Sequence, residues 1–134
     1  MQPGLVGERL WLFSDGGALV KWRPVRAGRT PRPLCWYRTT FPRPRGGAPV
    51  GLDMTGMGKG LAWVNGRCIG RYWNLVAQVD KDNWLIPFTD PSIAGGPTQR
   101  YYHVPLDWLE DRNTLVIFEE LGGDPSCIRL CRRV

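Results

Sequence analysis

One short stretch of the chain concentrates residue types that commonly contact ligands. The eleven residues from Trp63 to Trp73, WVNGRCIGRYW, combine three aromatic rings with two arginines. An arginine beside a large aromatic ring can stack a sugar or anchor a neighbouring protein surface. The Asn65-Gly66 pair is typical of a tight hairpin turn, because both residue types tolerate positive φ angles. We therefore expect a hairpin, with any ligand or docking site on its exposed face.

Alternation along the second half of this hairpin separates the side chains into two sets. It predicts Arg71 and Trp73 on one face with Ile69, and Tyr72 on the other with Cys68 and Gly70. A second group of rings and polar donors follows near residue 100. The candidates for carbohydrate binding or domain docking are Trp63, Asn65, Arg71, Tyr72, Trp73, Arg100, Tyr101 and His103. For each of them the alternative role is packing inside the fold or between domains.

Catalytic chemistry is not expected from the acidic and histidine residues. Glu119 and Glu120 are adjacent in a predicted strand, where neighbours point to opposite faces. A retaining glycosidase needs two carboxyl groups facing one cleft, about 5 Å apart. We interpret this pair as acids near the edge or end of a strand. For His103, the sequence supplies no nucleophile and no orienting group, so no catalytic residue is predicted.

The four cysteines do not form a metal-binding pattern. Cys35, Cys68, Cys127 and Cys131 include no C-x-x-C pair, and the chain has one histidine. We expect no metal and no cofactor. Alternation in SCIRLCRRV places Cys127 and Cys131 on one side of a predicted strand, about 13 Å apart along it, too far apart to bridge. Reduced thiols are expected, with a cross-strand disulfide as the alternative.

The composition favours an all-β chain of one domain, residues 1–134. The 17 glycines and 12 prolines indicate many turns among short elements. Alternating or β-branched runs predict strands in ERLWLF, ALVKW, CWYRTTF, PVGLDM, LAWV, CIGRYW, RYYHV, NTLVIFEE and CIRLCRR. Only PLDWLED suggests a helix, of one or two turns. The prolines of GRTPRP and FPRPRGGAP predict loops at strand ends.

The whole chain has a net charge of +6. Its basic residues are concentrated in the first third of the sequence. Between Asp15 and Asp53 there are eight bases and no acid: Lys21, Arg23, Arg26, Arg29, Arg32, Arg38, Arg43 and Arg45. A solvated basic face is the simpler interpretation. The alternative is a surface for polyanions such as nucleic acid or acidic polysaccharide, with Trp22, Trp36 and Tyr37 as stacking rings.

Neither a membrane span nor a signal peptide is expected. No stretch reaches the roughly 18 to 20 apolar residues that a membrane helix requires. The first ten residues, MQPGLVGERL, do not show a basic start followed by an apolar run. Localisation is not predicted from these residues.

Three long motifs resemble a known family when they are taken in order. LDMTGMGKGLAWVNGRCIGRYW, GGPTQRYYHVPLDWL and NTLVIFEELGGDPSCIRL are similar to the C-terminal jelly-roll domain of plant-type β-galactosidases, glycoside hydrolase family 35. The likeness extends back through CWYRTTF and GLVGERLWL. It departs from the plant pattern between Trp73 and Pro97, where the usual cysteines are missing, so a long variable loop is expected at about 74–97.

The resemblance implies an antiparallel β-sandwich of the galactose-binding type, with about eight strands. It also implies a separate (β/α)-barrel that carries both catalytic glutamates and hydrolyses terminal β-D-galactose residues. The expected function is therefore a non-catalytic accessory domain that packs on this barrel. A galactoside-binding module is the first alternative, and polyanion binding through residues 21–45 is the second. The family resemblance suggests secretion to the apoplast or cell wall.

Overall fold

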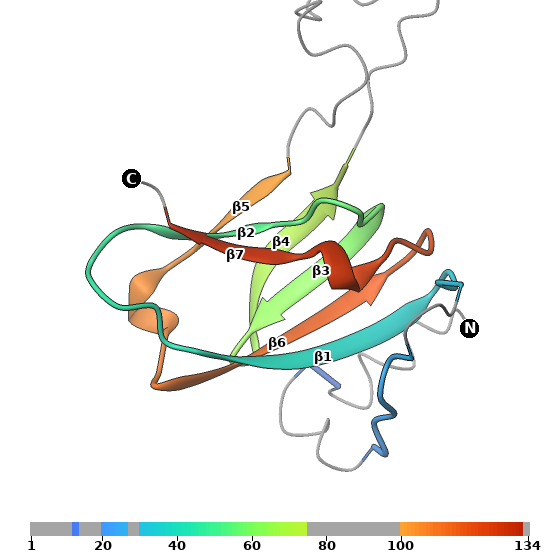
Figure 1. Ribbon diagram of the computed structural model, residues 1–134, viewed down its shortest axis with the longest axis horizontal. Coiled ribbons are helices and arrows are strands. Elements are labelled where there is room, and N and C mark those ends of the chain that lie inside the picture. Colours follow the sequence, from blue (N-terminus) through green and yellow to red (C-terminus); the bar gives the residue numbers. More distant parts are fainter. Residues whose placement is uncertain (1–11, 14–19, 27–29, 75–99, 133–134) are drawn as a thin grey trace, which may run out of the picture.

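The fold consists of two antiparallel β-sheets packed face to face (Figure 1). The computed structural model describes residues 12–13, 20–26, 30–74 and 100–132. A four-stranded sheet has the order β1-β6-β3-β4 and a three-stranded sheet the order β5-β2-β7. The strands are β1 (Cys35–Pro42), β2 (Val50–Asp53), β3 (Lys59–Val64), β4 (Arg67–Trp73), β5 (Tyr101–Val104), β6 (Arg112–Glu119) and β7 (Arg129–Arg132). The all-β antiparallel sandwich expected from the sequence is confirmed.

Two short 3-10 turns complete the regular structure of the residues described here. The turn η3 (Leu106–Trp108) follows β5, and η4 (Pro125–Cys127) precedes β7. The helical segment expected in PLDWLED is therefore a single turn, with Leu109 buried just after it. In the ranges that the structure describes, no helix is long and apolar enough to cross a membrane.

The main hydrophobic core lies between the two sheets. Strand alternation turns one set of side chains inward, so β2, β3, β5 and β6 each contribute every second residue. Tyr37 and Phe41 of β1 pack against this core, so Tyr37 is not a stacking ring on the outward face. Its buried members are Val50, Leu52, Met54, Met57, Ala62, Val64, Tyr72, Tyr102, Val104, Leu109, Leu115 and Ile117.

The opposite, outward face of the four-stranded sheet carries a second, smaller cluster. Trp63, Val116 and Phe118 are buried there. Four partly buried side chains cover them: Phe13, Trp22, Trp36 and Leu61. Phe13 and Trp22 come from the part of the chain that precedes β1. The four-stranded sheet is therefore covered on both faces over part of its area, which explains why an outward position such as Trp63 is buried.

The hairpin predicted at Asn65-Gly66 joins β3 to β4. Asn65 has φ 50° and Gly66 has φ 78°, which is the backbone geometry of a tight hairpin turn. A β-bulge interrupts the register between Ala62 and Trp63, and strict alternation along β4 is lost there. Ile69 packs against the main core as a result, so its predicted place beside Arg71 is wrong.

Several sequence expectations need correction or lie outside the described residues. The strand predicted in ALVKW is wrong, because residues 20–22 have no strand conformation. Cys127 is in η4 and not in a strand with Cys131, and all four cysteines are free. Most of ERLWLF and nearly all of the 74–97 loop, including the short strand suspected there, fall outside the described residues.

Candidate functional site

The structure distributes the eight candidate residues over three places. One group has its side chains engaged inside the fold, a second points outward from β4, and a third lies on or next to β5. The groups are, in that order, Trp63, Asn65 and Tyr72; Arg71 and Trp73; and Arg100, Tyr101 and His103. The hairpin therefore does not present all of its polar and aromatic residues on one surface.

Trp63 belongs to the outward aromatic cluster of the four-stranded sheet. Its side chain is 5% exposed. The ring stacks on Phe13 at 5.2 Å between centroids and on Trp36 at 5.3 Å. Aromatic pairs at these separations add to the gain from burying the rings. Trp63 therefore links the four-stranded sheet to the side chains that pack on its outward face, including Phe13.

Asn65 uses its whole side-chain amide within the fold. The Nδ2 group donates to the Trp108 carbonyl at 2.8 Å and to Oδ1 of Asn113 at 2.9 Å. The Oδ1 atom accepts from the Thr114 backbone N–H at 2.9 Å. Asn113 is fully buried and also bonds the backbone of Glu110. The turn residue thus locks the β3–β4 hairpin to η3 and to the start of β6.

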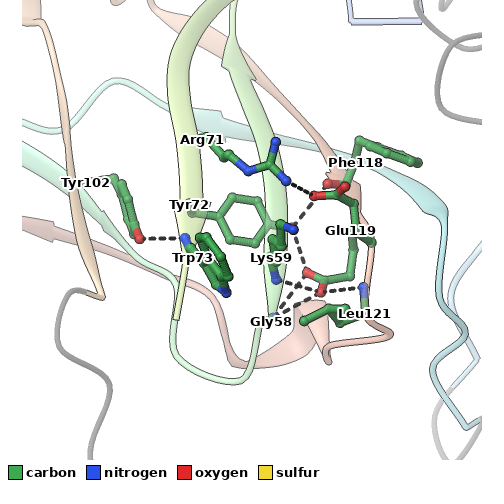
Figure 2. Close-up of polar contacts among 10 residues, drawn as sticks. Gly58, Lys59, Arg71, Tyr72, Trp73, Tyr102, Phe118, Glu119 and Leu121 are labelled. Atoms are coloured by element: carbon green, nitrogen blue, oxygen red, sulfur yellow. Dashed lines mark hydrogen bonds and ion pairs between the residues drawn. The ribbon is translucent and has the colours of Figure 1, made fainter. Parts of the chain in front are cut away.

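Tyr72 points into the interior and reaches the carboxylate of Glu119 (Figure 2). Its hydroxyl donates to Glu119 Oε2 at 2.6 Å. Burial raises the pKa of the Tyr72 phenol, and the hydrogen bond to Glu119 raises that pKa further. The phenol therefore stays protonated and keeps donating across the neutral pH range.

Glu119 is a fully buried carboxylate surrounded by donors. Besides Tyr72, it accepts backbone N–H groups from Gly58 at 3.0 Å, Lys59 at 3.1 Å and Leu121 at 3.3 Å. Neutral donors thus solvate the carboxylate in place of water, which makes its burial tolerable. The carboxylate ties the end of β6 to the start of β3 and to β4.

The sequence placed Glu119 near the end of its strand but did not anticipate its burial. The missed signal is alternation: Leu115 and Ile117 face the main core, and continuing every second residue leads inward to Glu119. The same period leads inward at the other end of β6 to Asn113. Polar residues at inward positions of a central strand indicate buried networks, because they must find partners there.

Arg71 and Trp73 lie together on the outward face of β4, as predicted. Arg71 forms an ion pair with Glu120, with 3.0 Å between Nη2 and Oε2. The Trp73 ring is 47% exposed, and the Lys59 ammonium lies 4.6 Å from its centroid. The Trp73 backbone N–H also donates to the Tyr102 hydroxyl at 3.0 Å. This arrangement holds a large aromatic ring in place while leaving half of it accessible.

The third group is on the outward face of the three-stranded sheet. Strand register aligns Tyr101 with Asp53 and Arg129, and His103 with Gly51. The Tyr101 ring is 52% exposed, and the Arg100 guanidinium lies 4.8 Å from its centroid. Asp53 accepts from the Thr55 backbone N–H and hydroxyl through the same oxygen, Oδ1. An aromatic ring here has acidic and basic groups beside it.

The two adjacent glutamates do not make a hydrolytic pair. Glu119 points between the sheets to Tyr72, whereas Glu120 points outward to Arg71. Two carboxyl groups that point to opposite sides of the sheet cannot face a single sugar. Across residues 12–13, 20–26, 30–74 and 100–132, no group of three or more His, Cys, Asp or Glu residues could hold a metal ion.

Comparison with known proteins identifies the family. Residues 34–113 match the family described as beta-galactosidase, galactose-binding domain. The chain is 45% identical to Beta-galactosidase 3 and 45% identical to Beta-galactosidase 6 of Oryza sativa subsp. japonica, with 97% and 98% of the chain covered. The chain is 42% identical to Beta-galactosidase 10 of Arabidopsis thaliana, with 97% of the chain covered. The chain spans only 16 to 19% of these relatives. It belongs to the galactose-binding domain family of the β-galactosidases.

Proposed function

We propose that this chain is a non-catalytic accessory domain of a β-galactosidase and that it packs on a separate catalytic barrel. In this proposal the barrel hydrolyses terminal β-D-galactose residues. The domain stabilises the enzyme by covering part of the barrel surface. The relatives are named as β-galactosidases and are five to six times longer than the matched segment, which supports a role within a larger enzyme.

Trp73 is the observation that carries the proposal. A tryptophan that is half exposed on a sheet face, and fixed by Lys59 and Tyr102, has apolar area left to bury. Tryptophan and arginine are enriched among the residues that contribute most to protein interfaces. Arg71 next to it, already oriented by Glu120, adds directional donors at the edge of the same surface. We call Arg71, Trp73, Lys59 and Glu120 the β4 patch.

A paired substitution in the intact β-galactosidase that carries this domain tests the proposal. Arg71→Ala with Trp73→Ala should lower the thermal stability of the intact enzyme and increase proteolysis between the domains. The chain alone should keep its circular dichroism spectrum, because both side chains point outward. Tyr101→Ala on the other sheet is the matched control. Unfolding of the chain alone would show that Trp73 is needed for the fold, and an unchanged intact enzyme would refute docking through the β4 patch.

Binding of a galactoside is the second candidate function, and the outward face of the three-stranded sheet favours it. Tyr101 offers an exposed ring, and strand register aligns Asp53 and Arg129 with it. His103 lies two residues further along β5 and offers another hydrogen-bonding group. Sugars are held by such a ring with polar groups around it. Titration of the chain with β-galactosides should show binding that Tyr101→Ala removes. Binding lost instead with Trp73→Ala would move the sugar site to the β4 patch.

A further inference from the structure

The turn between β3 and β4 places two residues in sequence that can react with each other. The side-chain carbon Cγ of an asparagine can be attacked by the backbone nitrogen of the next residue, which closes a five-membered succinimide ring. Gly66 favours this step at Asn65, because a glycine has no side chain to crowd the attacking nitrogen. The other three asparagines precede a leucine, a tryptophan and a threonine, at Asn74, Asn83 and Asn113. Asn65 is therefore the asparagine of this chain that is most prone to deamidation.

Deamidation of Asn65 consumes water and releases ammonia. The Gly66 nitrogen gives up its proton to base and forms a bond to Asn65 Cγ, while the bond from Cγ to Nδ2 breaks. The departing nitrogen takes up a proton and leaves as ammonia. Water then opens the succinimide at either of its two carbonyl carbons. The products are aspartate and isoaspartate, and nothing is oxidised or reduced.

In the folded domain, hydrogen bonds hold the Asn65 amide in place. Nδ2 donates both of its hydrogens, to the Trp108 carbonyl at 2.8 Å and to Asn113 Oδ1 at 2.9 Å. Oδ1 accepts from the Thr114 backbone N–H at 2.9 Å. Attack at Cγ makes this carbon tetrahedral and expels Nδ2, so the amide cannot keep all three bonds while it reacts. The network therefore opposes deamidation as long as it stays closed.

The partners of Asn65 are themselves fixed, so the amide is released only when this end of the hairpin separates from η3 and β6. The Asn65 backbone N–H donates to the Thr114 carbonyl at 2.9 Å. Asn113 is fully buried, accepts the Glu110 N–H at 2.8 Å and donates to the Glu110 carbonyl at 2.9 Å. Segments at the ends of strands can open locally at a lower free energy than the whole domain.

We infer that Asn65 is a deamidation site gated by local opening of the hairpin end, and that deamidation prevents this end from closing again. In the aspartate product, a carboxylate oxygen replaces Nδ2 opposite the Trp108 carbonyl and Asn113 Oδ1, and neither atom can donate to it. Glu110 holds the Asn113 amide in its present orientation. Isoaspartate instead adds a carbon to the backbone of the tight turn. The reaction does not require the accessory role proposed above.

Peptide mass spectrometry of the chain, incubated at mildly alkaline pH, measures the reaction. Trypsin releases residues 60–67, GLAWVNGR, and the product peptide is heavier because OH replaces NH2. The folded chain should form this product at least about tenfold more slowly than the same chain in denaturing urea, because opening must precede reaction. In urea, Asn65 should react faster than the other asparagines. Equal rates in the folded and unfolded chain, or no product in urea, would refute the inference.

A pair of variants distinguishes local opening from unfolding of the whole domain. Asn113→Ala removes one acceptor of the Asn65 amide and should speed deamidation of the folded chain by at least about threefold. Tyr72→Phe is the matched control, because it removes a buried hydrogen bond near the other end of β4 and should leave the rate nearly unchanged. Equal acceleration in both variants would show that the reaction follows global unfolding and would overturn the gate.

Two measurements on the natural sequence keep the inference testable if Asn113→Ala does not fold. In amide hydrogen exchange, the Thr114 N–H should exchange faster than the Ile117 N–H in the middle of β6, and equal protection would again mean global opening. Deamidated chain, separated by ion exchange, should unfold at a lower temperature than unmodified chain. An unchanged midpoint of thermal unfolding would show that the modified turn closes normally, which contradicts the second half of the inference.

Discussion

The hydroxyl of Tyr72 in β4 donates to Glu119 in β6 at 2.6 Å, across a strand that lies between them. The intervening residue of β3 is Gly60, which register aligns with both. A Cβ atom at Gly60 would lie 2.7 Å from the Tyr72 hydroxyl and closer still to the Phe118 carbonyl. The missing side chain thus allows the tyrosine to reach the buried carboxylate. This contact fixes the strand whose outward side carries Arg71 and Trp73.

Removing the Tyr72 hydroxyl should destabilise the domain. Tyr72→Phe deprives Glu119 of its shortest hydrogen bond, and bonds to charged groups contribute about 1.5–3 kcal/mol. Chemical denaturation should show a loss of that size, whereas Tyr101→Phe, at an exposed ring, should change the free energy of unfolding by less than about 0.5 kcal/mol. In a double-mutant cycle with Glu119→Gln, the two losses should be strongly non-additive. Additive losses would show that the hydroxyl and the carboxylate act independently.

The same contact predicts a loss of stability in alkaline solution. The folded-state pKa of Tyr72 is raised above its ordinary value of 10.0, by burial first and by Glu119 second. Above about pH 10 the unfolded chain releases this proton and the folded chain keeps it, so the free energy of unfolding falls by up to about 1.4 kcal/mol per pH unit. The stability that the protonated Tyr72 phenol contributes is fully present below about pH 10. Urea denaturation between about pH 9 and pH 11 should show a shallower decline for Tyr72→Phe than for wild type or Tyr101→Phe, and equal slopes would contradict the assignment.

The hairpin turn supplies a third prediction. Gly66 has φ 78°, a region that a β-branched residue resists, so Gly66→Val should cost about 1–2 kcal/mol of stability. Gly47→Val is the control, because Gly47 is exposed and nothing lies within 4 Å of a Cβ built there. Thermal unfolding should separate the two variants clearly. A similar small effect in both would mean that the turn relaxes to another conformation.

Local signals in the sequence predicted most of the fold. Alternation and turn residues placed β1 to β7 closely, and the Asn-Gly pair predicted the hairpin. They failed where a distant contact overrides alternation: the bulge turns Ile69 inward, and the cover from Trp22 buries the outward Trp63. The expected strand around Trp22 is absent because that residue serves as a cover and not as a ladder partner in the described structure.

The candidate site was predictable only in part, for a related reason. Sequence alone supplied the pairing of Arg71 with Trp73, because a shared face follows from a spacing of two residues. It could not supply the partner of Tyr72, since Glu119 is 47 residues away and separated from it by a further strand. Residue type suggested that Asn65 and Tyr72 could contact a sugar, but their polar groups are engaged by distant parts of the same chain.

The last prediction concerns Asn65, whose backbone and side-chain amide have two separable roles. Its backbone adopts positive φ, and its side chain donates to the Trp108 carbonyl and to Asn113 Oδ1. Asn65→Gly keeps the turn and removes only the side-chain bonds, so it should cost about 1–3 kcal/mol through the unsatisfied partners. Asn65→Asp keeps the acceptor for the Thr114 N–H but points a carboxylate oxygen at two other oxygens.

Asn65→Asp should therefore destabilise the domain more than Asn65→Gly at about pH 7. The repulsion raises the pKa of the introduced carboxyl group above its ordinary value of about 3.9, so the penalty should shrink as the pH falls through the raised pKa and the acid becomes a donor. Denaturation curves of both variants at about pH 4 and pH 7 measure this difference. A larger cost for Asn65→Gly, or a cost of Asn65→Asp that does not change with pH, would show that the turn conformation and not the amide network is what Asn65 contributes.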